Sequence, residues 1–488
     1  MAIPEQSIPS DELFQRMEAY RARDLSWRDG RTWGFIYDAG KEVEAIAKKA
    51  YTSFLSENAL DPTGFPSLLK FENEIVGMAA DHLNAPEGAA GNFTSGGTES
   101  ILLAIKTARD WARATKPEIK TPEMILPTTA HAAFHKGAHY FDVKVVPVKV
   151  DGETFKADMD AVKAAVTENT ILIVGSASSY AHGVCDPIEE MAALADEKGI
   201  LCHVDGCIGA FLLPYFKELG ADIPAFDFSV KGVTSISMDL HKYAYAPKGA
   251  STIIYRDASL RRYQIYACAE WTGYSVVNPT VQSTKSGGPL AGAWAVLNTI
   301  GQEGYRQIAK DLLDATNALI EGIEKIPALK ILSKPEMSLI AFTSDEVNVF
   351  HIVDEMKERG WYVQAQLAFD NSPANIHLTV APGNIPQVEP LLKDLADSVE
   401  AARKLPEITL PESMMGMMSS LDPSQLDDNM VTMMLGMAGI QGTSLPERMA
   451  GINTLLNVMP AKLKERLLSE FLNTMFAPVR GKPAAAMA

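Results

Sequence analysis

The sequence of 488 residues has no feature typical of a membrane, secreted or nucleic-acid-binding protein. No run approaches the roughly 18 consecutive apolar residues of a membrane-spanning helix. The N-terminal residues lack the basic start and apolar block of a secretory signal. The formal net charge of −17 leaves no basic surplus for binding a nucleic-acid backbone, although a local basic pocket is compatible with it. We therefore expect a cytoplasmic protein with no membrane span and no nucleic-acid partner.

Cysteine is scarce, and its spacing indicates no pairing. Cys185, Cys202, Cys207 and Cys268 form no Cys-x-x-Cys pair, so neither a zinc site nor a disulfide framework is indicated. We expect buried or spare thiols in a reducing compartment. In contrast, 47% of the residues are hydrophobic and 22% are charged, which is the composition of a folded protein. The length predicts two or three domains.

Short apolar runs alternate with helical stretches between about residues 91 and 255. Runs such as 124–126, 171–174 and 200–204 are typical of strands in βαβ units. This pattern predicts an α/β fold with a large, mostly parallel sheet and helices on both faces. A long helix at about 289–326 leads to a second series of strands and helices. The predicted units are an N-terminal helical segment (1–65), a large α/β domain (66–305), a smaller α+β domain (306–404) and a Met-rich helical extension (405–488).

A run of small residues precedes the first helical stretch of the large domain. Residues 94–100 (TSGGTES), which include Gly96, Gly97 and Thr98, stand directly before the helical run 101–113. Small residues let backbone N–H groups approach an anion, and the helix N-terminus adds positive potential. The run is therefore a candidate phosphate cradle. On its own it is equally compatible with a tight turn that caps the helix.

Three further residues stand where an α/β sheet is expected to bind a ligand. Asp205 ends the run 200–204, where a carboxylate could pair with a protonated ring nitrogen or act as a helix cap. Lys242 follows a predicted strand, and burial is expected to lower the pKa of its amine so that it condenses with an aldehyde. The alternative is a surface lysine. His131 could stack on a flat ring or be an ordinary core histidine.

Taken in chain order, these residues supply the contacts that pyridoxal 5′-phosphate (PLP) needs. They are a phosphate loop, a stacking imidazole, a carboxylate for the ring nitrogen and a lysine for the Schiff base. The sequence therefore predicts a PLP-dependent enzyme that carries its cofactor on Lys242. A non-catalytic interaction protein on the same fold is the alternative from another functional class.

Several longer motifs resemble the sphingosine-1-phosphate lyase family, in the group II PLP decarboxylase branch of fold type I. The resemblance covers about residues 32–403 and is weaker past 405. The motifs that carry it are GNFTSGGTESILLAIKTARDWAR, AHAAFHKGAHYF, GSASSYAHGVCDPIEEMAALA, LCHVDGCIGAFLLPY, FDFSVKGVTSISMDLHKYAYAPKGASTIIYRD and GAWAVLNTIGQEGY.

The resemblance implies a role for each candidate residue. It implies that Lys242 forms the Schiff base and that His241 lies near the cofactor phosphate. It further implies that Lys248 and Tyr37 act towards a substrate phosphate. Such enzymes are dimers with active sites shared between subunits, so a homodimer is implied. The remaining cofactor contacts implied by the resemblance are Gly97, Thr98, His131, Asp205 and Thr284.

The chain departs from the family pattern at four places near the expected substrate. Asp61 stands where the family has a histidine, and Lys285, beside Thr284, stands where it has an arginine. The second change keeps a positive charge but loses a bidentate guanidinium. Val276 replaces a tyrosine that Tyr274 could supply only by shifting. In addition, Leu240 replaces the threonine before His-Lys.

These residues predict a PLP-dependent lyase that acts on a small-molecule amine. The favoured reaction is retro-aldol cleavage of a phosphorylated or anionic amino alcohol to an aldehyde and an amine. The alternative is decarboxylation of an amino acid, because the lyase-type histidine and arginine are missing while every cofactor contact remains. No metal is expected.

Overall fold

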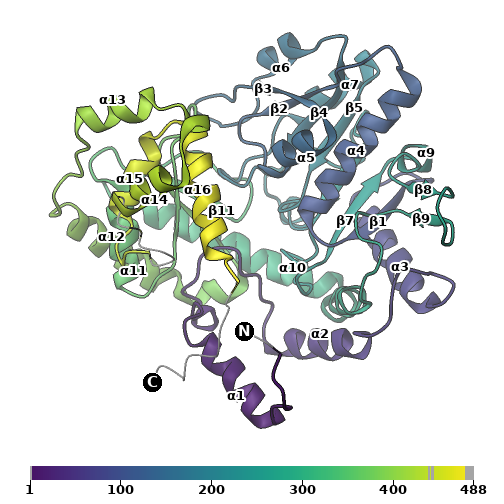
Figure 1. Ribbon diagram of the computed structural model, residues 1–488, viewed down its shortest axis with the longest axis horizontal. Helices are drawn as coiled ribbons and strands as arrows, with labels where there is room; N and C mark the ends of the chain where they lie inside the picture. The colour runs from purple at the N-terminus through teal and green to yellow at the C-terminus, as the bar shows by residue number, and fades with distance from the viewer. Residues whose placement is uncertain (1–2, 438–439, 441–444, 479–488) are drawn as a thin grey trace.

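The computed structural model describes residues 3–437, 440 and 445–478 (Figure 1). The N-terminal segment is helical, as predicted. Its elements are α1 (Ser10–Arg21), η1 (Trp27–Asp29), α2 (Lys41–Ser53) and α3 (Pro66–His82). No residue of α1 is buried, whereas α2 and α3 both pack on the long helix α10 (Gly288–Glu324). The N-terminal helix α1 is therefore an arm on the surface of its own chain.

The main sheet has the strand order β1-β7-β6-β5-β4-β2-β3, and of these strands only β7 runs antiparallel to its neighbours. This confirms the predicted, mostly parallel sheet. The strands are β1 (Ala90–Thr94), β2 (Glu123–Pro127), β3 (Lys144–Val148), β4 (Thr170–Ser176), β5 (Leu201–Asp205), β6 (Ser235–Met238) and β7 (Ser251–Tyr255). The helices between them and after β7 are α4 (Gly97–Thr115), α5 (Ala133–Phe141), α6 (Met159–Ala165), α7 (Ile188–Lys198), α8 (Leu213–Glu218) and α9 (Ala258–Arg261).

Alternating side chains of the central strands enter two different cores. In β2, Met124 and Leu126 pack in one buried cluster and Ile125 in another, as the period of two in a strand requires. All seven residues of β4 are buried. Helices therefore cover both faces of the sheet, as predicted, and the open positions for a ligand are the strand ends.

The smaller unit is an antiparallel sheet with the order β10-β11-β13-β12. Its elements are β10 (Lys330–Ile331), β11 (Leu339–Thr343), α11 (Val349–Glu358), β12 (Gln364–Gln366), β13 (Asn375–Thr379), η2 (Pro382–Gln387) and α12 (Val388–Ala402). The helix α10 joins it to the main sheet and breaks at Gly301, whose φ is 62°. The predicted boundary at 305 falls inside this helix, and the division into four units stays a prediction.

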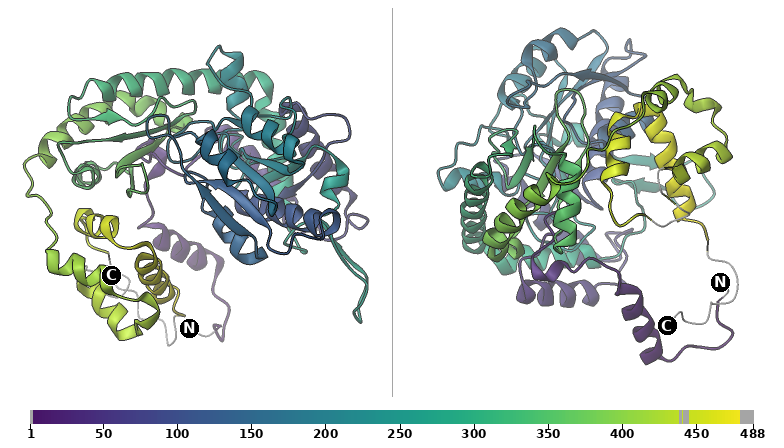
Figure 2. Two further views of the ribbon diagram at one scale, coloured as in Figure 1. Left: turned by 90° about the horizontal axis from the view of Figure 1, so that it is seen from above. Right: turned by 90° about the vertical axis from the view of Figure 1, so that its left-hand side faces the viewer.

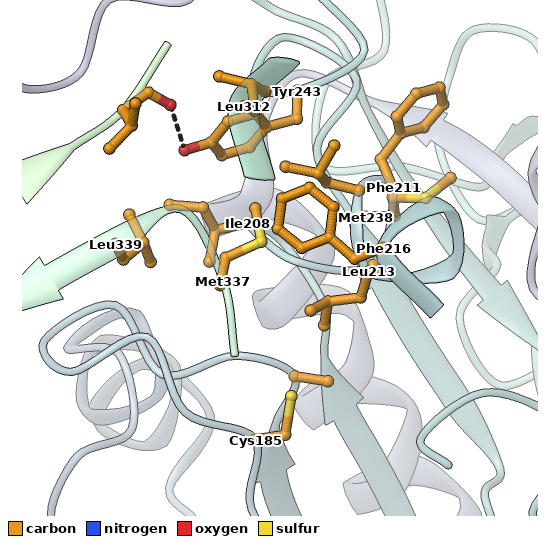
Figure 3. Packing of buried hydrophobic residues seen from close by; sticks show 14 of the residues in the cluster. Cys185, Ile208, Phe211, Leu213, Phe216, Met238, Tyr243, Leu312, Met337 and Leu339 are labelled. Carbon is orange, nitrogen blue, oxygen red and sulfur yellow. Dashed lines mark hydrogen bonds between the residues drawn. The ribbon is translucent and has the colours of Figure 1, made fainter. Parts of the chain in front are cut away.

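The interface between the two sheets is a continuous apolar core (Figure 3). Tyr243, directly after Lys242, is buried there, and its hydroxyl donates to the carbonyl of Val380 at 3.0 Å. Met238, Leu312 and Leu339 lie around it in the same cluster. Packing of Tyr243 between the large and small units therefore fixes the backbone next to Lys242.

A hairpin that the sequence did not predict follows the main sheet. It consists of β8 (Tyr266–Cys268) and β9 (Val276–Asn278). Trp271 and Tyr274 at its turn are 50% and 64% exposed. An exposed aromatic pair on a projecting hairpin leaves apolar surface uncovered in the single chain.

The C-terminal extension forms a helical module beside α11 (Figures 1 and 2). Its elements are α13 (Glu412–Ser420), η3 (Pro423–Gln425), α14 (Asp428–Met437), α15 (Ala450–Val458) and α16 (Ala461–Met475). It has its own apolar cluster, made of Met418, Leu426, Val431, Met459, Leu463 and Leu467. In the part of the chain that the structure describes, no helix combines the length and apolar character needed to cross a bilayer.

Candidate active site

A cavity of about 730 Å³ opens at the carboxyl ends of β4, β5 and β6, beside the N-terminus of α4. Most of the residues predicted from the sequence line it. They are Tyr37, Gly97, Thr98, His131, Asp205, His241, Lys242 and Lys248. The structure therefore brings together candidates that span more than 200 positions of the chain. This is the site expected at the strand ends of an α/β sheet.

The predicted phosphate cradle has no room for side chains at its centre. A Cβ atom on Gly97 would lie 2.7 Å from Oδ2 of Asp239 and 2.8 Å from Sγ of Cys207. Close packing of the start of α4 against Asp239 and Cys207 therefore requires the glycine, and it sets the N-terminus of the helix, the end that favours anions, at the cavity wall. The carboxylate of Glu99 accepts from the N–H of Ser95 at 2.6 Å and fixes the turn. Glu99 belongs to the predicted cradle run, but the sequence analysis gave its carboxylate no role.

Lys242 forms a close ion pair with Asp239 in the cavity. The distance from Nζ of Lys242 to Oδ2 of Asp239 is 2.9 Å, and Asp239 is buried. Burial opposes the charge on Lys242, but attraction by Asp239 outweighs it and raises the pKa of the amine. The expectation that burial lowers this pKa was therefore wrong for the cofactor-free chain. The missed signal was an acid three residues before the lysine.

Asp205 and His131 lie on the walls that a flat ring would contact. Asp205 is buried at the end of β5, and its Oδ1 accepts from the N–H of Cys207 at 3.1 Å. The hydroxyl of Ser237 is 3.4 Å from the same oxygen. His131 is exposed in the open cavity, and its Nδ1 accepts from the N–H of Ala133 at 3.2 Å. Both placements are compatible with the roles that the sequence predicts.

Lys248 and Tyr37 lie next to each other on the wall of the cavity. The ammonium of Lys248 is 4.8 Å from the centroid of the Tyr37 ring and donates to the carbonyl of His241 at 3.2 Å. Although the Lys248 side chain as a whole is exposed, loss of water around its ammonium and repulsion by Lys242 lower its pKa to about 8. Burial raises the pKa of Tyr37, so its phenol remains a hydrogen-bond donor.

A second phenol in the cavity was not predicted from the sequence. The hydroxyl of Tyr180, beyond the end of β4, donates to Oε1 of Gln364 on β12. Both residues line the cavity, and burial raises the pKa of Tyr180. Gln364 comes from the small unit, so only tertiary structure brings the pair together. No local motif could have identified it.

The residues at which the chain departs from the family pattern lie outside the cavity of this chain. Thr284 is exposed on the loop between β9 and α10 and does not line the cavity. Lys285 lies beside the segment of Asp61, because the N–H of Ala59 donates to the carbonyl of Lys285 at 2.8 Å. Asp61 is exposed and caps its own turn by accepting from Thr63. The chain segments that contain Asp61 and Lys285, two of the departures from the family pattern, are therefore adjacent in space.

The donor set of the cavity fits PLP. Gly97 and Thr98 place the N-terminus of α4 at the cavity, where it would favour a phosphate, and Lys242 offers the amine for an aldehyde. Oδ1 of Asp239 is buried and accepts no hydrogen bond within the described chain. No cluster of three or more potential metal ligands occurs among the described residues.

Comparison with known proteins also indicates a PLP-dependent enzyme. The model of the pyridoxal-dependent decarboxylase conserved domain matches residues 4–345, and that of a C-terminal HTH domain of pyridoxal-dependent enzymes matches residues 412–474. The chain is 42% identical to a sphingosine-1-phosphate lyase of Oryza sativa subsp. japonica over 81% of this chain and 74% of that protein. A solved sphingosine-1-phosphate lyase of Burkholderia pseudomallei matches with a TM-score of 0.79 and 38% identity, over 83% of this chain and 93% of the other. A glutamate decarboxylase of Lactobacillus brevis matches with a TM-score of 0.74 over 84% and 96% of the two chains, and its 19% identity supports the fold alone.

Proposed function

The chain belongs to the family of pyridoxal-dependent decarboxylases that includes the sphingosine-1-phosphate lyases, and from this we propose that it cleaves the Cα–Cβ bond of a phosphorylated amino alcohol. It is a PLP-dependent lyase with the fold of type I PLP enzymes, as the sequence analysis predicted. The proposal concerns its substrate. The single observation that carries it is the pair Lys248 and Tyr37 on the wall of a cavity that is also lined by Lys242 and Asp205.

The residues of the chain divide into two groups around the proposed reaction. When bound, PLP supplies an electron sink for the bond that breaks at Cα. Lys242 would hold the cofactor covalently, and Asp205 would pair with its ring nitrogen. His131 would cover the ring, and Gly97, Thr98 and His241 would receive its phosphate.

The second group recognises the substrate. Lys248 offers a positive charge and Tyr37 a protonated phenol to a phosphate, which is the pairing that a strong anion requires. Tyr180 and Gln364 face the same cavity and are available to a substrate hydroxyl. The two pairs would thus receive a phosphate and a hydroxyl, two polar groups of a phosphorylated amino alcohol.

Decarboxylation of an amino acid remains the second candidate. It is favoured by two adjacent chain segments, one with Asp61 and one with Lys285, because both residues depart from the pattern of the lyases that the chain resembles. An acid in place of a histidine removes a group that could take up a proton or contact an anion. Both segments lie outside the cavity of this chain. If they affect the reaction, they do so in the active site of a second subunit.

We also propose a homodimer with shared active sites. The exposed loop with Thr284 and the hairpin with Trp271 and Tyr274 leave the body of the chain, which suits residues that complete a neighbouring site. Their uncovered aromatic surface is typical of an interface. A cytoplasmic location is proposed as well, supported by four free cysteines in the described chain.

Product analysis on a small panel of amines tests the proposed reaction. We expect release of an aldehyde and phosphoethanolamine from a phosphorylated long-chain amino alcohol, and no CO₂ from glutamate or aspartate. Release of CO₂ from an amino acid, with no aldehyde from the phosphorylated amino alcohol, would establish the decarboxylase instead. Lys242→Ala is the control that removes either activity.

A further inference from the structure

The edge strand β12 forms the small-unit wall of the active-site cavity. It lies at the end of its sheet and pairs with β13 alone. Gln364, its first residue, accepts from the Tyr180 hydroxyl inside the cavity. The position of β12 therefore sets the distance between the small unit and the substrate. An edge strand has one unpaired side, so it needs other contacts to hold it.

Residues 367–372 after β12, here called the strap, cross from the small unit to the large one. Phe369 and Ser372 close a tight turn by exchanging two backbone hydrogen bonds of 3.0 Å. At the tip, Nδ2 of Asn371 donates to the carbonyl of Val150 at 3.1 Å. The strap also closes a cavity of about 290 Å³ that shares His131 and Tyr180 with the active site. The strap is therefore continuous with the wall of the site.

The outer side of the strap is held by the C-terminal module. Oδ1 of Asn457 in α15 accepts from the N–H of Ala368 at 2.7 Å. This N–H follows the last paired residue of β12, and the asparagine satisfies it in place of a neighbouring strand. Asn457 itself is only partly exposed.

The helix α15 is fixed firmly enough to act as this support. Asp354 of α11 is buried, and its two oxygens accept from the N–H groups of Met449 and Ala450 at 2.8 and 2.9 Å. A carboxylate from another helix therefore caps the start of α15. Arg448 adds an ion pair of 2.7 Å to Glu355. These contacts fix α15 on the small unit at the end opposite Asn457.

We propose that Asn457 is a positioning residue for substrate binding, acting through the strap and the Gln364–Tyr180 contact. The C-terminal module takes part in the reaction in this way although none of its described residues lines the active-site cavity. The measurement of KM rests on the function proposed above, because it uses the proposed substrate. The measurement of hydrogen–deuterium exchange in the strap does not depend on the substrate.

The test compares three variants of the full-length, PLP-loaded enzyme. Asn457→Ala removes the acceptor, and Asn457→Asp keeps one. Asn453→Ala removes the same side chain one turn earlier in α15, where no side-chain hydrogen bond is described. We expect Asn457→Ala to raise KM about 2- to 10-fold, the range for one lost hydrogen bond, with kcat and PLP content nearly unchanged. Asn457→Asp and Asn453→Ala should retain the wild-type KM.

Hydrogen–deuterium exchange separates this inference from the proposed function. Exchange of the peptide that covers 366–372 should speed up in Asn457→Ala and not in Asn453→Ala, whichever amine the enzyme accepts. Unchanged exchange and unchanged KM in Asn457→Ala would overturn the inference, as would an equal effect in Asn453→Ala. Faster exchange in an enzyme that releases CO₂ would support the positioning role while rejecting the proposed reaction.

Discussion

The active-site cavity and the C-terminal module are stabilised in different ways. In the cavity, charged groups are buried against one another, as in the ion pair of Lys242 and Asp239. The module has a separate apolar cluster and is joined to the small unit by a few polar contacts around Asp354 and Asn457. Removing one partner of a buried pair leaves an uncompensated charge, whereas removing a peripheral module leaves the main core intact. We therefore expect changes in the cavity to reduce activity and changes in the module to reduce stability.

The largest effect is expected for Lys242→Ala in the cavity. The change removes the amine that binds the cofactor and leaves Asp239 buried without its partner. We expect activity to fall by about 10³-fold or more, since covalent catalysis loses its nucleophile. Absorbance of bound PLP and mass spectrometry after borohydride reduction would measure the loss.

Lys248→Ala is the control for this prediction. It lies in the same cavity but should keep the borohydride-stable link to PLP. Linkage of PLP to the Lys242→Ala protein at another residue would show that the lysine assignment is wrong.

A smaller effect is expected from the titration of Lys248. Its pKa is lowered to about 8, so its positive charge is present at lower pH and is lost as the pH rises through this value. The KM for a phosphorylated substrate should therefore rise above an apparent pKa at or above about 8, by up to about tenfold per pH unit. A phosphate bound nearby would favour the charged lysine and shift this pKa upward.

Steady-state kinetics from pH 7 to 10 would measure this dependence. The substrate phosphate is already fully ionised over most of this range, so it does not mask the lysine. Lys248→Arg should keep a low KM across the range, because a guanidinium stays charged. A wild-type KM that is flat to pH 10 would contradict a role for Lys248 in anion binding.

The two regions also differ in how far the sequence predicts them. The cavity follows local motifs, because Gly97, Asp205 and Lys242 each stand next to an apolar run that forms a strand or helix. Family resemblance then added Lys248 and Tyr37. The direction of the pKa shift of Lys242 was predicted wrongly, because burial was considered and the attraction by Asp239 was not.

The features that the sequence analysis missed depend on contacts between distant residues. The strand β1 was not predicted because it holds Gly91 and Asn92 instead of an apolar run. A Cβ at Gly91 would lie 2.5 Å from the carbonyl oxygen of Ile253, so close pairing with β7 requires the glycine. Gln364 and Tyr180 meet only after the two units pack together. The role of Thr284 stays a prediction.

The Met-rich module was predicted to be helical, and it is. Its apolar residues divide between interior and surface. Met418 is buried, whereas Met415, Met430 and Met433 are 39%, 38% and 61% exposed. The side chains of Met414, Met417, Leu435 and Met437 lie outside the described residues. The family match to an HTH domain does not indicate nucleic-acid binding here, because residues 412–474 hold seven acidic and four basic side chains.

The smallest effect on cofactor chemistry is expected from deleting the chain after Leu410. The deletion removes the helix that Asp354 caps and uncovers apolar surface on α11, so it should lower the Tm by roughly 5 °C and reduce solubility. Bound PLP and its borohydride-stable link to Lys242 should persist, because no described residue beyond 410 lines the cavity. Thermal unfolding followed by absorbance of the cofactor would measure both quantities together.

A liposome flotation assay then decides what the exposed methionines contact. The module lacks the Lys- and Arg-rich face that draws an interfacial helix to anionic lipid, and Asp422, Asp427 and Glu447 oppose such binding. We therefore expect neither the intact protein nor the truncated one to float with anionic vesicles. Flotation of the intact protein, abolished by the deletion, would assign the module to a membrane surface. In that case the difference between the two regions would be one of location, with chemistry in the cavity and lipid capture in the module.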